Sequence, residues 1–229
     1  MDEQQFAALR QQMLLEIVAD TLFTKDRIGS DTLDARVMEV MGKVPRHEFV
    51  PIELQPYAYL NRPLPIGFEK TISQPFIVAL MTDLLQLQEE DTVLEIGTGL
   101  GYHAAILAEL GREVYTIEII GELARQATTR LSRLRYANIE IKVANGYYGW
   151  PQHAPFDKVI VTAAPDLIPP PLLNQLRPGG RMVIPAGLPD HQQLILVEKD
   201  SGGRVTTREI LPVRFSQLEE GDFGQGPVS

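Results

Sequence analysis

Apolar side chains recur at helical spacing in the first third of the chain. This spacing predicts helices over residues 4–22, 31–41 and 74–87, the second of them ending at Gly42. Between the last two helices, Pro63, Pro65 and Gly67 interrupt the pattern and predict a loop over 57–71.

From residue 92 onward, short apolar runs alternate with helical stretches. Strands are predicted at 92–96, 114–118, 139–143, 158–162 and 181–184, and helices at 102–110, 121–134 and 171–176. Such alternation implies a parallel sheet covered on both faces. Two further strands, 193–198 and 206–215, are joined by a Gly202-Gly203 turn and predict an antiparallel finish. The predicted fold class is α/β, with a mostly parallel sheet and an N-terminal helical extension.

We see no internal repeat and no flexible linker, so a single domain over 1–229 is predicted. Within it, residues 1–90 form the extension with its loop, 91–218 form the sheet-containing core, and 219–229 form a mobile tail.

The strongest chemical signal is the turn Glu95-Ile96-Gly97-Thr98-Gly99-Leu100-Gly101, between a predicted strand and a predicted helix. Open α/β sheets bind ligands at the carboxyl ends of their strands. The glycine spacing is G-x-G-x-G, whereas a dinucleotide site has G-x-G-x-x-G. An acid at Glu95 favours a cationic sulfonium over a pyrophosphate, and Glu118 ends the next strand, where it can accept both ribose hydroxyls. S-adenosylmethionine is therefore favoured over NAD, and a tight turn without a ligand is the remaining alternative.

Two other segments carry polar groups with two interpretations each. Asn145, before Gly146, can accept a hydrogen bond from an adenine amino group, or can simply form an Asn-Gly turn. Thr71 and Ser73 lie two residues apart at a loop-to-helix junction and can hold a carboxylate against a methyl donor. Ser73 can equally be a helix N-cap with Pro75 in the first turn, and the two roles are compatible.

Composition excludes several other kinds of chemistry. The formal net charge is −9, which argues against a general nucleic-acid binder. The chain has no cysteine, so disulfides and thiolate chemistry are excluded, and its 4 histidines lack metal-ligand spacing. Trp150 and its neighbouring tyrosines are expected to pack rather than to stack on bases. The N-terminal residues do not resemble a secretory signal and no apolar run is long enough for a bilayer, so a cytoplasmic location is expected.

Several stretches together resemble one enzyme family. They are Val44–Pro51, the Pro-Leu-Pro-Ile-Gly run at 63–67, Thr-Ile-Ser-Gln-Pro at 71–75, 95–102, Ala-Pro-Phe-Asp at 154–157, Val-Thr-Ala-Ala-Pro at 161–165, Leu-Arg-Pro-Gly-Gly at 176–180 and Pro-Val-Arg-Phe at 212–215. The chain is similar to protein-L-isoaspartate O-methyltransferases from about residue 30 to residue 218, nearly its whole length.

This resemblance implies a Rossmann-like fold that binds S-adenosylmethionine. It implies methylation of the free carboxylate of L-isoaspartyl residues, and also of D-aspartyl residues, in damaged proteins or peptides, after which the ester collapses to a succinimide. A monomer without nucleic-acid, membrane or metal partners is expected. Ser73 and Thr71 are the expected catalytic residues. The expected cofactor-binding residues are Ile72, Ser73, Glu95, Gly97, Thr98, Gly99, Gly101, Tyr102, His103, Glu118, Ile119, Asn145, Gly146 and Thr162.

Three positions depart from the family pattern. Phe68-Glu69-Lys70 stands where the family usually has x-Gly-Gln, Asn145 stands for an Asp, and Ser216-Gln217 stands for Val-Pro. These changes leave open a dedicated aspartyl peptide as acceptor, or a cofactor-binding protein without turnover. The acceptor carboxylate is already ionised at pH 7, since its ordinary pKa is near 4, so the reaction needs positioning more than a base.

Overall fold

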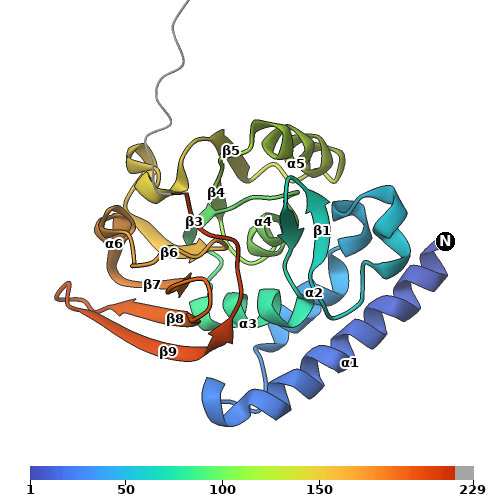
Figure 1. The fold of residues 1–229 in the computed structure, drawn as a ribbon, viewed down its shortest axis with the longest axis horizontal. Coiled ribbons are helices and arrows are strands. Elements are labelled where there is room, and N and C mark those ends of the chain that lie inside the picture. The colour runs from blue at the N-terminus through green and yellow to red at the C-terminus, as the bar shows by residue number, and fades with distance from the viewer. Residues whose placement is uncertain (220–229) are drawn as a thin grey trace, which may run out of the picture.

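The structure, a computed structural model, describes residues 1–219 and contains a seven-stranded sheet in the order β5-β4-β3-β6-β7-β8-β9 (Figure 1). Five strands are parallel: β3 (Thr92–Ile96), β4 (Glu113–Glu118), β5 (Ile139–Val143), β6 (Phe156–Val161) and β7 (Leu176–Ala186). Two antiparallel strands complete the sheet, β8 (Gln192–Lys199) and β9 (Val205–Val213). The predicted α/β class and its antiparallel finish are confirmed.

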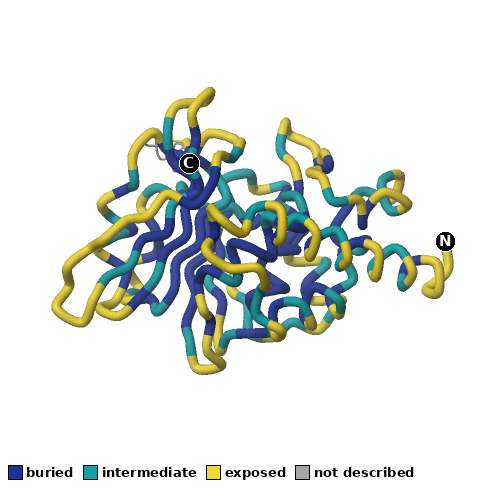
Figure 2. The backbone as a smooth tube through the Cα atoms, turned by 90° about the horizontal axis from the view of Figure 1, so that it is seen from below, coloured by how far each residue is buried: buried dark blue, intermediate teal, exposed yellow. Residues whose placement is uncertain are grey.

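The sheet separates two apolar cores, because successive side chains of a strand point to opposite faces. Val93 of β3 belongs to the larger core, and its neighbour Leu94 belongs to the smaller one. Four helices pack with the sheet: α3 (Pro75–Leu85), α4 (Tyr102–Ala108), α5 (Gly121–Arg133) and α6 (Pro170–Gln175). The first three contribute to the larger core, and α6 to the smaller one. Because helices cover the sheet, the strands are mostly buried and the connections between elements are mostly exposed (Figure 2).

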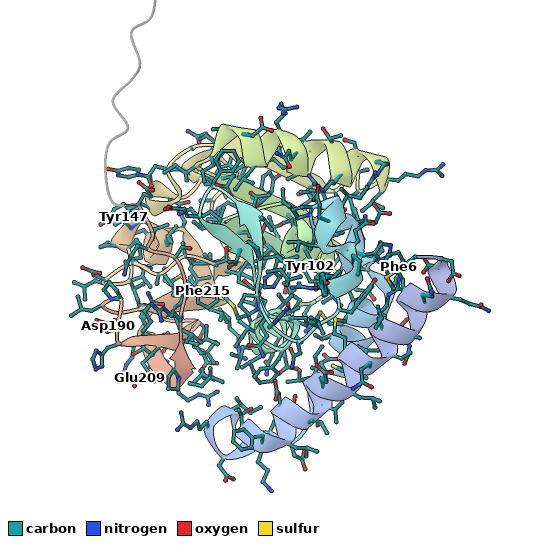
Figure 3. The ribbon with its side chains drawn as sticks, turned by 45° about the vertical axis from the view of Figure 1, so that its right-hand side comes forward. Phe6, Tyr102, Tyr147, Asp190, Glu209 and Phe215 are labelled. Atoms are coloured by element: carbon teal, nitrogen blue, oxygen red, sulfur yellow. The ribbon has the colours of Figure 1, made fainter. Side chains whose placement is uncertain are left out.

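The N-terminal extension consists of α1 (Glu3–Ile28) and α2 (Ala35–Lys43), followed by the short 3-10 helices η1 (Arg46–Phe49) and η2 (Ile52–Tyr57). Helix α1 is longer than the predicted 4–22. Asp2 and Gln5 form a capping box at its start, and Gly29 ends it in the left-handed conformation with φ 82°. Its inner side buries Phe6, while Tyr102 of α4 lies deeper in the molecule (Figure 3).

The loop predicted over 57–71 is wrong in its second half, where β1 (Leu64–Gly67) and β2 (Lys70–Ile72) form an antiparallel hairpin. Leu64 and Ile66 are buried, whereas Pro65 and Gly67 are exposed. Proline is tolerated because this two-stranded sheet stands apart from the main one and leaves free edges. Pro65 and Gly67, which predicted a loop, therefore occupy a short strand, and Pro63 directly precedes it.

The strand predicted at 181–184 begins earlier, because β7 also includes Leu176 to Gly180. Its pairing with β6 is irregular between Phe156 and Lys158, which accommodates the Pro-Gly-Gly sequence. Two more 3-10 turns, η3 (Gly146–Tyr148) and η4 (Pro151–His153), connect β5 to β6. The tail predicted at 219–229 lies outside the described residues except for Glu219.

Candidate active site

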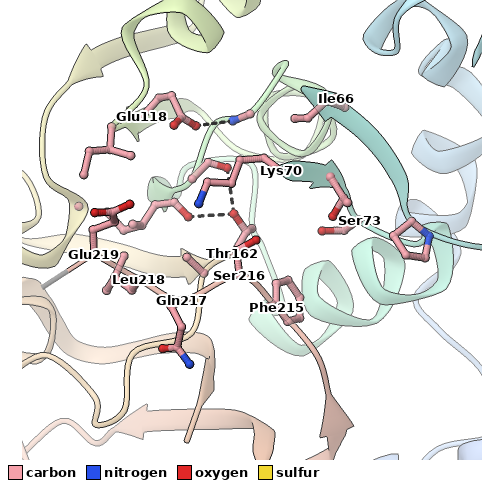
Figure 4. A pocket seen from close by; sticks show the side chains of 18 of the residues that line it. Ile66, Lys70, Ser73, Glu118, Thr162, Phe215, Ser216, Gln217, Leu218 and Glu219 are labelled. Carbon is pink, nitrogen blue, oxygen red and sulfur yellow. Dashed lines mark hydrogen bonds between the residues drawn. The ribbon is translucent and has the colours of Figure 1, made fainter. Parts of the chain in front are cut away.

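A cavity of about 550 Å³ opens at the carboxyl edge of the parallel strands, where the ends of β3, β4 and β6 meet the β1–β2 hairpin (Figure 4). Its lining includes nine of the residues predicted for the site. These are Thr71, Ser73, Gly97, Gly99, Glu118, Ile119, Asn145, Gly146 and Thr162. Segments that are far apart in the sequence thus converge on one pocket.

Gly97 lines this pocket and has no room for a side chain. Its φ is 99°, and a Cβ atom there would lie 2.3 Å from Oγ1 of Thr162. The Thr162 hydroxyl donates to the carbonyl oxygens of Ile96 at 3.0 Å and Gly97 at 2.9 Å. The end of β6 therefore fixes the glycine turn after β3 and leaves its backbone open to a ligand.

Glu118 lies at the end of β4 and holds the turn from the other side. Its Oε2 accepts from the backbone N–H of Gly99 at 2.8 Å, and its Oε1 accepts from Ile120 N–H at 3.0 Å. Burial raises the pKa of this carboxyl, although the backbone donors and the charge of Lys70 lower it. Each carboxylate oxygen keeps a further lone pair for a ligand hydroxyl.

Glu95 is not placed as expected, because its side chain is fully buried and does not line the cavity. Its Oε2 accepts from Thr116 Oγ1 at 2.6 Å, and Thr116 Oγ1 is also 2.6 Å from Thr98 Oγ1. Burial raises the pKa of Glu95 to about 8, so the group is mainly neutral at pH 7. Glu95 and Thr98 therefore act on the glycine turn from inside the core rather than on a cationic ligand.

Tyr102 and His103, both expected to bind the cofactor, do not line the pocket with their side chains. Tyr102 is buried and its hydroxyl faces Met41 Sδ at 3.8 Å. His103 bonds Thr82 Oγ1 through Nε2 at 2.9 Å, and desolvation lowers its pKa to about 3. Both side chains are core groups, since helix α4 is buried along its entire length.

Gly101 and Ile72 do not line the cavity either. A Cβ at Gly101 would lie 3.0 Å from Leu131, so this glycine serves the close packing of α4 on α5. Ile72 is buried in the larger core beneath the hairpin. Their expected contact with a cofactor remains a prediction.

Asn145 combines the two interpretations given above. Its Oδ1 accepts from the N–H of Tyr147 at 2.9 Å, which is the turn interpretation, and the residue also lines the cavity. Gly146 beside it is closely packed, because a Cβ there would lie 2.2 Å from Ile96.

Thr71 and Ser73 bring two hydroxyl groups to the same wall. Neither hydroxyl forms a hydrogen bond within the part of the chain that the structure describes. Ser73 is not the N-cap of α3. Gln74 is the N-cap, and its side chain forms no capping bond. The N–H of Phe76 in the first turn donates to Asn61 Oδ1 at 3.0 Å instead. Both hydroxyls are therefore available to a ligand.

Sequence reasoning missed most of the wall formed by the C-terminal segment, residues 212–219. This segment returns from β9 to the carboxyl edge, where Ala164 N–H donates to Ser216 O at 2.8 Å and Leu218 N–H donates to Ala164 O at 2.8 Å. The Pro-Val-Arg-Phe stretch at 212–215 and the departure at 216–217 were noted, but no residue of this segment was predicted for the site. Lys70, half-buried in the cavity wall, was noted as a departure but not as a site residue.

Two kinds of feature are absent from residues 1–219. Within this range no group of three or more acidic or histidine side chains is arranged to hold a metal ion. No helix in the same range has the length and apolarity that a membrane span requires.

The chain was compared with known proteins. A family model for protein-L-isoaspartate(D-aspartate) O-methyltransferase matches residues 19–222. A Polaromonas protein named protein-L-isoaspartate O-methyltransferase 1 is 66% identical over 98% of this chain and 95% of its own length. A Syntrophobacter fumaroxidans protein-L-isoaspartate O-methyltransferase 2 is 59% identical over 94% and 88%, respectively.

Solved structures agree with the sequence relatives. One protein-L-isoaspartate O-methyltransferase aligns with a TM-score of 0.77 at 27% identity, covering 94% of this chain and 67% of the other. A second structure, from Plasmodium falciparum, was determined in complex with S-adenosyl-L-homocysteine. It aligns with a TM-score of 0.74 at 22% identity, covering 90% of this chain and 98% of its own, and supports the fold.

Proposed function

The chain belongs to the protein-L-isoaspartate O-methyltransferase family, and we propose that the cavity at the carboxyl edge is where it performs the family's reaction. The protein transfers a methyl group from S-adenosylmethionine to the free carboxylate of L-isoaspartyl residues, a step in protein repair. The observation that supports this location is the convergence of two unpaired hydroxyls, Thr71 and Ser73, with the Gly97 turn and Glu118.

The residues present fit S-adenosylmethionine. The backbone at Gly97 leaves space that a Cβ atom would fill, and Glu118 offers carboxylate lone pairs beside it. Asn145 and Gly146 line the adjacent end of the cavity, where an adenine ring is expected. We assign the sugar to Glu118, the base to Asn145 and the amino-acid portion to the Gly97 turn.

When bound, S-adenosylmethionine supplies a methyl group on a sulfonium, which is already a good leaving group. The residues of this chain therefore need only to orient the acceptor. Ser73 and Thr71 donate hydrogen bonds to the isoaspartyl carboxylate and hold one oxygen toward the methyl group. Holding reactants in line contributes up to roughly 7–11 kcal/mol in favourable cases. Because a hydrogen bond also weakens a nucleophile, these hydroxyls position the carboxylate rather than activate it.

The decisive experiment measures methyl transfer from labelled S-adenosylmethionine to an isoaspartyl peptide and to its normal aspartyl twin. We expect labelling of the isoaspartyl form alone. Labelling of the aspartyl twin would instead indicate a dedicated aspartyl acceptor, consistent with the Phe68-Glu69-Lys70 and Ser216-Gln217 departures. Cofactor binding without labelling of either peptide would indicate a protein that has lost turnover.

We further propose that the enzyme works as a cytoplasmic monomer on damaged proteins and peptides, including D-aspartyl forms, without nucleic-acid or membrane partners. The net charge of −9 supports the absence of a nucleic-acid partner. Sedimentation of the pure protein tests the first point, since a dimer would have twice the mass of 25.6 kDa.

A further inference from the structure

Arg46 is a buried cation without a carboxylate. Its exposed fraction is 0%, and no ion pair reaches it within the described residues. Burial lowers the pKa of Arg46 to about 10, so the guanidinium remains charged at pH 7. A buried charge is normally costly unless an opposite charge compensates it. Only neutral groups surround the guanidinium of Arg46, and its Nη1 has no hydrogen-bond partner among the described residues.

The groups around Arg46 indicate its role. Nη2 donates to the backbone carbonyl oxygen of Ser73 at 2.7 Å, and Nε donates to that of Ala58 at 2.7 Å. The guanidinium carbon also lies 4.8 Å from the centre of the Tyr102 ring. One planar group thus joins η1, the end of η2 and the residue whose hydroxyl faces the cavity.

The residues on either side of Ser73 are held separately. Ile72 is paired with Leu64 in the hairpin, Gln74 Nε2 donates to Asp20 Oδ2 at 3.4 Å, and Phe76 N–H donates to Asn61 Oδ1 at 3.0 Å. Among the described residues, the side-chain bond to Ser73 itself comes from Arg46. The Ser73 hydroxyl has no partner in residues 1–219 and can rotate about χ1, so the backbone sets the positions that it can reach. Fixing the Ser73 carbonyl therefore restricts where the hydroxyl can point.

We propose that Arg46 is a positioning residue of the methyl transfer: its guanidinium holds the Ser73 carbonyl, and through it the hydroxyl that orients the acceptor carboxylate. This inference rests on the proposed role of Ser73. Arg46 does not line the cavity and does not touch the substrate. Lysine cannot replace it, because an ammonium lacks the planar fork that reaches both carbonyls.

Kinetics of Arg46→Lys, Ser73→Ala and the double variant test the proposal. We expect Arg46→Lys to lower kcat at least 10-fold while the Kd for S-adenosylhomocysteine changes less than threefold. The double variant should be as slow as Ser73→Ala alone within about twofold, since both changes disable the same hydroxyl. A kcat within twofold of wild type, or losses that multiply in the double variant, would overturn the proposal.

Arg181→Lys is the matched control. Arg181 also donates to a backbone carbonyl, that of Leu84 at 3.2 Å, but it lies outside the cavity wall. Its kcat should stay within twofold of wild type even where stability falls. If Arg46→Lys does not accumulate as folded protein, Arg46→Gln, which buries no charge, is measured against the same criteria.

Amide hydrogen exchange gives a readout that does not depend on turnover. In Arg46→Lys, exchange should accelerate at the first amides of α3, Phe76 to Val78, and stay unchanged in β3. Unchanged exchange at α3 would contradict the proposal. If the wild-type enzyme methylates no isoaspartyl peptide, the proposed function fails, and exchange still decides whether Arg46 holds the Ser73 segment.

Discussion

Glu95 and Glu118 show how two acids near the ends of adjacent strands acquire different properties. Both are buried, but Glu118 accepts two backbone N–H bonds at the cavity, whereas one oxygen of Glu95 has no partner among the described residues. Hydrogen bonds to a charged carboxylate favour ionisation, and burial opposes it. The sequence predicted both acids near the glycine turn, but only their orientation separates a ligand-binding group from a core group.

This difference predicts a pH effect on stability. The pKa of Glu95 rises from 4.5 to about 8 on folding, so the folded state binds the proton more tightly. This group stabilises the folded state at low pH. That stabilisation is lost as the pH rises from 4.5 to about 8, by up to about 1.4 kcal/mol per pH unit. Relative to Glu95→Gln, which cannot ionise, the wild type should lose stability between pH 5 and pH 8 in urea unfolding. If the free energies of unfolding of the wild type and Glu95→Gln changed equally with pH, folding would not raise the pKa of Glu95.

Ser73→Ala should reduce kcat/KM for the isoaspartyl peptide by about 10- to 100-fold. A hydrogen bond to a charged group contributes about 1.5–3 kcal/mol, and this one is expected to form with the acceptor carboxylate. Stability should hardly change, because the hydroxyl has no partner in the described structure. Urea unfolding measured beside the kinetics separates the two effects. An unchanged kcat/KM would remove Ser73 from the mechanism.

Gly97→Ala should destabilise the protein by more than about 2 kcal/mol and abolish cofactor binding. The backbone there has φ 99° and the new Cβ would lie 2.3 Å from Thr162. Gly179→Ala is the matched control: its φ is 80° with nothing within 4 Å, so it tests backbone strain alone. Equal losses in thermal unfolding would mean that contact with Thr162 contributes nothing.

At the scale of elements, the β1–β2 hairpin was the clearest failure of prediction from the sequence. Its turn residues Phe68 and Glu69 have φ 53° and 56°, a conformation in which asparagine and glycine are usual. The sequence therefore lacked a hairpin signal, and two prolines suggested a loop. By contrast, β3 and its glycine turn were predicted within a residue, because a buried parallel strand followed by glycines is a local pattern.

The strained turn predicts a stabilising substitution. Glu69→Gly should raise the free energy of unfolding by about 0.5–1 kcal/mol, since glycine adopts a positive φ without a Cβ clash, partly offset by greater freedom when unfolded. Glu90→Gly, at an exposed position without positive φ, should instead lower stability. Urea midpoints of both variants provide the test, and a loss of stability in Glu69→Gly would contradict the assigned turn geometry.

For the whole molecule, the sequence predicted which segments belong to the site better than it predicted which side chains face the cavity. Nine expected residues line one cavity, whereas Glu95, Tyr102 and His103 face the core. Motifs identify which backbone turns approach a ligand, but they do not encode which side of a buried strand or helix faces it. The C-terminal wall was missed for the same reason: its place depends on a chain reversal after β9 rather than on a local pattern.

Ligand binding should stabilise the entire fold. S-adenosylhomocysteine at 100 times its Kd should add about 2.7 kcal/mol, which corresponds to a rise of roughly 5–10 °C in Tm for a domain of this size. NAD at the same concentration should produce no shift, because the glycine spacing at 97–101 is G-x-G-x-G rather than the G-x-G-x-x-G of dinucleotide sites. Differential scanning fluorimetry distinguishes them, and a shift with NAD alone would reverse the cofactor assignment.

The return of residues 214–219 to the carboxyl edge has a consequence for biosynthesis. A ribosome that has made everything through β9 has supplied every strand of the sheet, but not the last wall of the cavity. Residues that follow β9 close the site, so a translation product truncated just after β9 would contain the sheet and lack a complete active site. Incomplete copies of this repair enzyme would then be catalytically silent instead of partly active.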